Sequence, residues 1–322
     1  MKKKVLLFRY RSCGAKSIDA TLNGKMFFVC PLELNDPFEF YVKYDIDKVY
    51  DLIQKNPKTK TIVAKMLYEH SINFSEINGF VSTPKTEEEC ITMFDDTNRL
   101  SQTKKWLQKE INKRIISFKE SFGIVSLTEN PKEAVMWSHY ASDSKGFLEV
   151  FDAELLVSNF AAYLRHISND YTKNQMMVIG AHRVKYVDNF KERNELVVKL
   201  LCSNVSTDLN IGIEFIDNEN TAKEVLEIVT SKQSAWSYER EIRLILPCDI
   251  YKFDRKKTED GKIIHDHFFE HTPAEPEKII LGYKGDTQLE YSLLYYCSKK
   301  KITFEKSNEF FDFDIDIYEK NL

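Results

Sequence analysis

Side chains alternate along the stretch Ser237-Tyr238-Glu239-Arg240-Glu241-Ile242-Arg243-Leu244-Ile245-Leu246. Successive residues of a strand point to opposite faces, so Glu239, Glu241 and Arg243 would share one face of an extended segment. Two carboxylates about 6–7 Å apart repel each other, which raises the pKa of one of them. The stretch therefore predicts a strand that carries an acid or a base. The alternative is a solvent-exposed face on which Arg243 neutralises both glutamates.

Further strands and helices are predicted on both sides of this stretch. Apolar runs predict strands at residues 4–10, 26–30, 123–127, 147–151, 176–186, 278–281 and 301–305. Apolar residues at three- and four-residue spacing predict helices at residues 131–141, 154–166, 190–203, 221–230 and 287–298. We expect one α+β domain over residues 1–322, with a mixed or antiparallel sheet, flanking helices and an inserted helical segment at about residues 47–120.

Two short motifs predict local structure between these elements. Asn130-Pro131-Lys132-Glu133 has the chemistry of a helix start, with Asn130 as the N-cap and Pro131 as the first helical residue. Asn35-Asp36-Pro37-Phe38-Glu39 predicts a turn, because the residue before proline disfavours helix. In that turn we expect Asn35 or Asp36 to bond the backbone and Phe38 to anchor the core.

Composition excludes several classes of protein. The 322 residues are 43% hydrophobic and 30% charged, with a net charge of −4, so no overall positive field exists to hold a nucleic-acid backbone. No segment approaches the roughly 18 apolar residues of a membrane span. The six cysteines form no CxxC pair, which is typical of neither a disulfide framework nor a zinc site. We therefore expect a soluble cytoplasmic protein with no membrane partner and no metal ligands among its cysteines.

Other polar side chains lie on segments that otherwise look like core. Arg9 and Arg11 share one face of the first predicted strand, with Tyr10 opposite, and arginine suits phosphate or carboxylate ligands. Ser126 and Thr128 share a face of a later strand. His139 and Tyr140 follow on a predicted helix, where His139 is either a ligand or base or a hydrogen-bonded core residue. The candidate binding residues are Arg9, Tyr10, Asn35, Ser126, Thr128, His139 and Tyr140, and the candidate catalytic residues are Glu239 and Glu241.

Several blocks of sequence resemble the bacterial domain-of-unknown-function family 2971. They are Leu7-Phe8-Arg9-Tyr10, Asn35-Asp36-Pro37-Phe38-Glu39, Met136-Trp137-Ser138-His139-Tyr140-Ala141, Trp236-Ser237-Tyr238-Glu239-Arg240-Glu241-Ile242-Arg243-Leu244 and Ile279-Ile280-Leu281-Gly282. The blocks occur in the order of that family and extend over nearly the whole chain. The resemblance implies no activity.

The order of polar residues also resembles ADP-ribosyltransferase-like domains. Such domains place a basic residue on the first strand, a hydroxyl residue on a middle strand and a Glu-x-Glu pair late in the chain. Arg9 (or Arg11), then Ser126 with Thr128, and then Glu239 with Glu241 would fill these places. This resemblance implies that NAD is consumed as a substrate and that its ADP-ribose passes to a macromolecule, protein or nucleic acid, as in a toxin or phage-defence effector.

Two other classes of function use the same residues. In a metal-dependent nuclease, the four carboxylates Asp36, Glu39, Glu239 and Glu241 would hold Mg²⁺, although no lysine stands at a nuclease-like spacing from them. In a non-catalytic binding module, the polar residues would form a structural network. The transferase predicts that Arg9, Ser126 and Glu241 line one cleft, and the nuclease predicts that several carboxylates converge.

Overall fold

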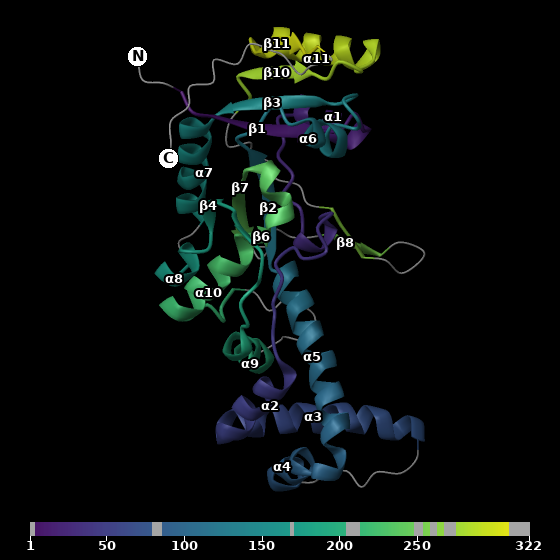
Figure 1. The fold of residues 1–322 in the computed structure, drawn as a ribbon, viewed down its shortest axis with the longest axis vertical. Coiled ribbons are helices and arrows are strands. Elements are labelled where there is room, and N and C mark those ends of the chain that lie inside the picture. The colour runs from purple at the N-terminus through teal and green to yellow at the C-terminus, as the bar shows by residue number, and fades with distance from the viewer. Residues whose placement is uncertain are drawn as a thin grey trace.

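A mixed seven-stranded sheet runs through the computed structural model, which describes residues 4–78, 86–167, 171–203, 213–247, 254–257, 263–266 and 275–308 (Figure 1). All neighbouring strands pair antiparallel except β10 with β11. The fold is α+β, as predicted. The order across the sheet is β11 (Thr303–Lys306), β10 (Lys278–Leu281), β3 (Phe147–Asp152), β1 (Leu6–Arg11), β2 (Phe122–Thr128), β7 (Glu241–Pro247) and β4 (Gly180–Arg183).

The sheet register brings three of the candidate strands side by side. β1 pairs with β2 at Phe8 and Thr128, and β2 pairs with β7 along its whole length. In that second pairing Ser126 lies opposite Arg243, and Thr128 lies opposite Glu241. Residues far apart in the sequence therefore meet at one end of β1, β2 and β7.

Helices cover both faces of the sheet and extend beyond it. Among them, α6 packs on β1 through the buried cluster of Phe8, Trp137, Leu148 and Ile280, while the apolar side of α11 packs on Ile279 and Leu281. The helices are α1 (Ala15–Leu22), α2 (Ile46–Lys55), α3 (Pro57–Asn78), α4 (Glu87–Asp95), α5 (Leu100–Glu120), α6 (Ala134–Tyr140), α7 (Ala153–Ile167), α8 (Lys173–Met176), α9 (Asn194–Cys202), α10 (Glu219–Val229) and α11 (Thr287–Lys300).

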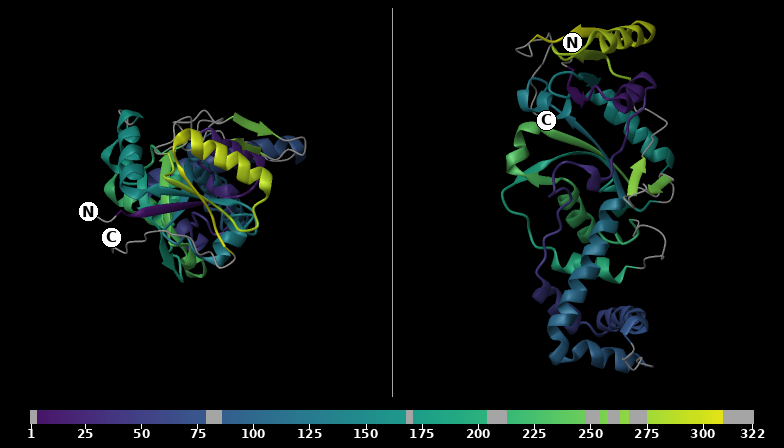
Figure 2. Two further views of the ribbon diagram at one scale, coloured as in Figure 1. Left: turned by 90° about the horizontal axis from the view of Figure 1, so that it is seen from above. Right: turned by 90° about the vertical axis from the view of Figure 1, so that its right-hand side faces the viewer.

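Four of these helices, α2 to α5, occupy the segment expected to be a helical insertion. They form the end of the molecule opposite β10, β11 and α11 (Figures 1 and 2). The side chain of Asp45 caps α2 by accepting hydrogen bonds from the amides of Asp47 and Lys48. The long helix α5 leads directly back into β2, burying Trp106, Leu107, Ile111 and Phe118 at helical spacing.

The remaining strands of the described ranges form two short sheets. β5 (Lys185–Val187) and β6 (Ser231–Gln233) pair in parallel, and β8 (Asp254–Lys257) pairs antiparallel with β9 (Ile263–Asp266). Of the strand predicted at residues 176–186, Met176 ends α8, residues 177–179 form a turn, and the rest is extended as β4 and β5, so that prediction was wrong in its first part.

The stretch chosen as one continuous strand is two elements. Residues Ser234–Glu239 form a 3₁₀ helix, Arg240 has a left-handed backbone (φ 42°), and β7 begins only at Glu241. The hydroxyl of Thr128 donates to the carbonyl of Glu239, which holds this bend against the end of β2. The alternation of side chains before Arg240 therefore does not reflect a strand. Glu239 lies near Glu241 because the chain turns at Arg240.

Three other local predictions were wrong. Residues 26–30 form no strand beyond one bridge between Val29 and Ile124. Helix α6 begins at Ala134 with Glu133 as its N-cap, not at Pro131 with Asn130 as its N-cap. The backbone of Asn130 and the carbonyl of Pro131 instead form hydrogen bonds with side chains elsewhere. Phe38 is 37% exposed, so it does not anchor the turn in the core.

Phe40, which is fully buried against Phe118 and Phe122, holds the segment in place of Phe38.

We predict that Trp137→Ala lowers the free energy of unfolding by about 3–5 kcal/mol, as large-to-small changes in a core do. The ring is fully buried, contacts Tyr10 edge-on at 5.2 Å, and donates from Nε1 to the carbonyl of Pro131 at 3.0 Å. Urea denaturation measures the loss. Val135→Ala on the exposed side of the same helix is the control, and a loss below about 1 kcal/mol for Trp137→Ala would contradict this packing.

Candidate functional site

A cavity of about 190 Å³ opens at the end of β1, β2 and β7. It has room for on the order of ten water molecules. Its walls are the strand residues of β1 and β2, the loop around Asn35 and Glu39, the end of α6 at Tyr140, and the side chains of Lys232, Glu239 and Glu241. We call this cavity the sheet-end pocket.

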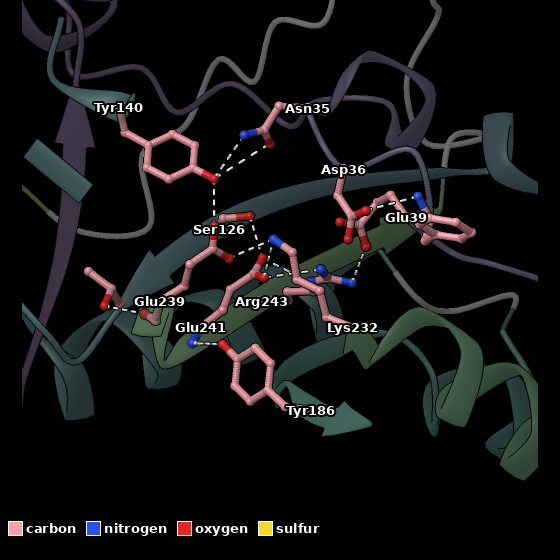
Figure 3. A network of polar contacts seen from close by, with 12 residues as sticks. Asn35, Asp36, Glu39, Ser126, Tyr140, Tyr186, Lys232, Glu239, Glu241 and Arg243 are labelled. Carbon is pink, nitrogen blue, oxygen red and sulfur yellow. Dashed lines mark hydrogen bonds and ion pairs between the residues drawn. The ribbon is translucent and has the colours of Figure 1, made fainter. Parts of the chain in front are cut away.

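Glu241 is held as a carboxylate by the groups around it (Figure 3). Arg243 donates to both of its oxygens, from Nε at 2.9 Å and from Nη2 at 3.0 Å, and Ser126 Oγ donates to Oε1 at 2.5 Å. Burial by itself would raise the pKa of Glu241. The charges of Arg243 and Lys232 lower it by a larger amount, so the pKa is about 2. Glu241 is therefore ionised at neutral pH.

Glu239 lies in a different environment although it is only two residues away. Tyr140 donates its hydroxyl to Oε1 at 2.5 Å, and Lys232 Nζ contacts Oε2 at 2.5 Å. Burial raises the pKa of Glu239 above its ordinary value, Lys232 opposes this, and the charge of Glu241 adds to it. Glu239 is thus the carboxyl of the pair that takes up a proton more readily.

Lys232 links the two glutamates. Its Nζ lies 2.5 Å from Glu239 and 3.5 Å from Glu241, and it also lies 4.8 Å from the centre of the Trp236 ring. Burial lowers the pKa of Lys232, but Glu241 and Glu239 raise it overall, so the ammonium stays charged. The lysine is buried on β6 and separates two like charges that would otherwise repel.

A third buried carboxylate, Glu39, completes the network from the other side. Its Oε1 lies 2.6 Å from Arg243 Nη1, and Arg243 itself has no exposed surface. Burial raises the pKa of Glu39, while the charge of Arg243 opposes the rise. Arg243 also donates from Nη1 to the carbonyl of Val229 at 2.7 Å, so one guanidinium joins β7, the loop at Glu39 and the end of α10.

Arg9 is a buried cation that forms no ion pair with any residue that the structure describes. It is 8% exposed and lines the sheet-end pocket, and its only hydrogen bond among the described residues runs from Nη2 to the carbonyl of Phe27. Its Nη1 has no hydrogen-bond acceptor there. Burial and the nearby Arg11 lower the pKa of Arg9 to about 9, so it remains a cation at neutral pH with a donor free for an anion.

The structure brings most of the predicted site residues together. Arg9, Tyr10, Asn35, Ser126, Thr128, Tyr140, Glu239 and Glu241 all line the sheet-end pocket. Tyr10 donates its hydroxyl to the carbonyl of Asn130, and Asn35 Nδ2 donates to the Tyr140 hydroxyl at 3.1 Å. The turn is held by Asp36, whose Oδ1 accepts from the amide of Phe38.

His139 is the exception among these candidates. It is exposed, its ring lies 6.2 Å from the neighbouring Tyr140 ring, and it does not line the pocket. Tyr140, at the end of α6, points into the pocket, so the residue before it, His139, points away from the pocket. The helix pattern could not show which of the two would face the site.

Sequence reasoning missed two members of the site. Lys232 lies on a three-residue strand with no distinctive pattern, and the hydroxyl of Tyr186 on β5 accepts a hydrogen bond from the amide of Glu241. Both come from the small β5–β6 sheet, which closes the pocket from outside the main sheet. The only hint in the sequence was that Lys232 follows closely on the apolar end of α10.

Carboxylates here face cations instead of one another. Glu39, Glu239 and Glu241 each contact Lys232 or Arg243, and within the described ranges no three His, Cys, Asp or Glu residues stand close enough to share a metal ion. In the same ranges, no helix is long and apolar enough to cross a membrane.

We predict that Glu241→Gln destabilises the protein by about 3–5 kcal/mol at pH 7, because it leaves buried cations short of a partner. The folded-state pKa of Glu241, about 2, lies below the ordinary 4.5. Its stabilisation is therefore present above pH 4.5 and is lost as the pH falls toward 2. Urea denaturation at pH 7 and pH 3 should show the difference between wild type and variant shrinking.

The control for this measurement is Glu277→Gln, which changes an exposed carboxylate paired with Lys4. Its cost should stay within about 0.5 kcal/mol at either pH. A Glu241→Gln cost that is the same at pH 7 and pH 3 would show that Glu241 is not the low-pKa group.

Comparison with known proteins gives one match. The model of the family described as "Protein of unknown function (DUF2971)" matches residues 136–244, a segment that starts in α6 and ends in β7 and includes Tyr140, Lys232, Glu239 and Glu241. No curated protein and no solved structure matches the chain. The chain is thus similar to this family over the segment that supplies the two glutamates, the lysine and the tyrosine of the pocket.

Proposed function

We propose that this protein is a cytoplasmic, NAD-consuming ADP-ribosyltransferase-like enzyme that modifies a macromolecule, in the role of a toxin or phage-defence effector. One observation carries the proposal. Arg9 on β1, Ser126 on β2 and Glu241 on β7 come from three neighbouring strands and line one pocket. These are the residues whose convergence a transferase of this kind requires.

Glu241 would stabilise positive charge during bond cleavage. When the bond between the nicotinamide nitrogen and the ribose C1′ breaks, its electron pair leaves with nicotinamide and the ribose becomes oxocarbenium-like. A carboxylate that stays ionised, fixed by Ser126 and Arg243, favours that charge without reorganising. The low pKa of Glu241, about 2, supports this role.

Glu239 would handle the proton of the acceptor. The acceptor nucleophile forms a bond to C1′ and must lose a proton, and a carboxyl of raised pKa accepts one better than an ordinary one. The Tyr140 hydroxyl and Lys232 fix its position from opposite sides. Two glutamates two residues apart thus take different roles because their surroundings differ.

Arg9 would hold the phosphates of the dinucleotide. Its buried, unpartnered Nη1 supplies a charge-assisted donor, and Arg11 adds a second cation in the same wall. Glu149 lies opposite Arg9 on β3 and its charge acts on the guanidinium, but Arg9 forms no ion pair with any described residue, so a bound anion would compensate its charge.

We predict that Glu241→Gln reduces NAD turnover by about 10²-fold or more while NAD binding changes little, because the lost interaction belongs to the transition state. Glu239→Gln should reduce turnover less, or change the choice of acceptor. Turnover is measured as nicotinamide release with a cellular extract as the source of acceptor, and binding by calorimetry.

Two further variants separate chemistry from folding. Glu305→Gln removes another carboxylate of the sheet, which pairs with Lys278 and lies outside the pocket, and should affect stability without a selective loss of kcat. Ser126→Ala should fold, since Ser126 is exposed, and should lose about 10-fold in kcat with the hydrogen bond to Glu241. Wild-type protein that releases no nicotinamide with any extract would remove the proposal.

We also predict a pH signature for Lys232. The base form of Glu239 is lost as the pH falls through its raised pKa, and Lys232 lowers that pKa. Lys232→Met should therefore move the acid limb of kcat/KM to higher pH, with activity recovering as the pH rises. Glu241 and Tyr140 also face Glu239 and remain in place.

Lys278→Met is the matched control, since Lys278 forms a half-buried ion pair with Glu305 away from the pocket. Its pH profile should be that of the wild type. A Lys232→Met variant that loses activity equally at every pH would mean that the lysine only supports the fold.

A further inference from the structure

A second cavity has a volume of about 180 Å³. It shares no lining residue with the sheet-end pocket, but neighbouring residues of the same segments serve the two sites. On β5, Lys185 and Val187 line the second cavity, while Tyr186 between them bonds to Glu241 in the first site. On β6, Ser231 lines the second cavity and Lys232 lines the first, as alternation along a strand requires.

The loop before α2 connects the two cavities in the same way. Asn35 and Glu39 face the sheet-end pocket, whereas Tyr41 lines the second cavity. Phe38, Tyr41 and Phe190 form an aromatic trio, with ring centres 5.2 to 6.5 Å apart. Phe38 and Tyr41 are each 37% exposed, so two of these rings present surface to solvent beside the opening.

Cations dominate the polar part of the second cavity. Its lining holds Lys185, Lys191, Arg193 and one carboxylate, Glu227, a net charge of +2 on a chain of net charge −4. Glu227 contacts both Lys191 and Arg193, at 3.1 Å in the case of Lys191. Lys185 is exposed and forms no ion pair with any described residue, so its charge is available to a ligand.

We propose that this second cavity binds a nucleotide, with the base against the aromatic trio and the phosphate at Lys185 and Lys191. A phosphate carries one negative charge as a diester within a strand and close to two as a monoester at neutral pH, and the net charge of +2 in the lining attracts either. Flat aromatic faces suit any base, and exposed lysines suit phosphate as point charges. The ligand is either a free nucleotide or a nucleotide within a single strand.

This proposal is independent of NAD consumption, and direct binding tests it. The probes are a fluorescein-labelled single-stranded DNA of about ten nucleotides, followed by fluorescence anisotropy at low salt, and unlabelled AMP as a competitor. Tyr41→Ala and Lys185→Glu should each weaken binding by about 10-fold, from lost stacking and lost phosphate attraction. Wild-type affinity should fall as salt is added.

Two matched variants control for general effects of charge and aromatic area. Lys284→Glu reverses an exposed lysine elsewhere, and Tyr291→Ala removes an exposed ring on α11; both should bind as the wild type does. Thermal melting confirms that all four variants fold.

Competition distinguishes the two sources of the nucleotide. Displacement by AMP, weakened in the Tyr41→Ala and Lys185→Glu variants, identifies a free-nucleotide site, and binding of the strand without displacement by AMP identifies a strand site. Either result supports the proposal. It is overturned if neither probe binds, or if Tyr41→Ala and Lys185→Glu bind both probes as tightly as Lys284→Glu and Tyr291→Ala.

Discussion

The fully buried guanidinium of Arg243 is the constraint on which the site depends. It contacts two carboxylates, Glu241 and Glu39, and the carbonyl of Val229. An unpaired charge at this depth would cost several kcal/mol, so β7, the loop at Glu39 and the end of α10 must meet in one arrangement. The pocket wall is thereby fixed by an electrostatic requirement in addition to apolar packing.

Different surroundings shift the pKa values of the two neighbouring glutamates in opposite directions. Glu241 accepts from Arg243 and Ser126, and its pKa falls to about 2. Glu239 pairs with a single cation of the described residues, Lys232, and its pKa rises. The left-handed turn at Arg240 makes this possible, because it takes Glu239 off the strand that carries Glu241. A regular strand would have given both carboxylates the same face and similar neighbours.

Much of the fold could be predicted from periodicity, including the strand at Lys278–Leu281 and the helical character of α2 to α5. The polar residues of β1, β2 and β7 could also be found, since arginine, serine and glutamate stand out on strands rich in apolar residues. Lys232 could not, because its role depends on where the β5–β6 sheet packs, which no local pattern encodes. The bend at Arg240 was hidden for a related reason: a tertiary hydrogen bond from Thr128 holds it.

The most direct test is a crystal structure with a non-cleavable NAD analogue in which carbon replaces the glycosidic nitrogen. If the pocket binds the dinucleotide as proposed, a phosphate will lie within hydrogen-bond distance of Arg9 Nη1, and the ribose C1′ will lie over the carboxylate of Glu241. An analogue bound away from the sheet-end pocket, or one whose ribose faces neither Glu241 nor Glu239, would contradict the assignment.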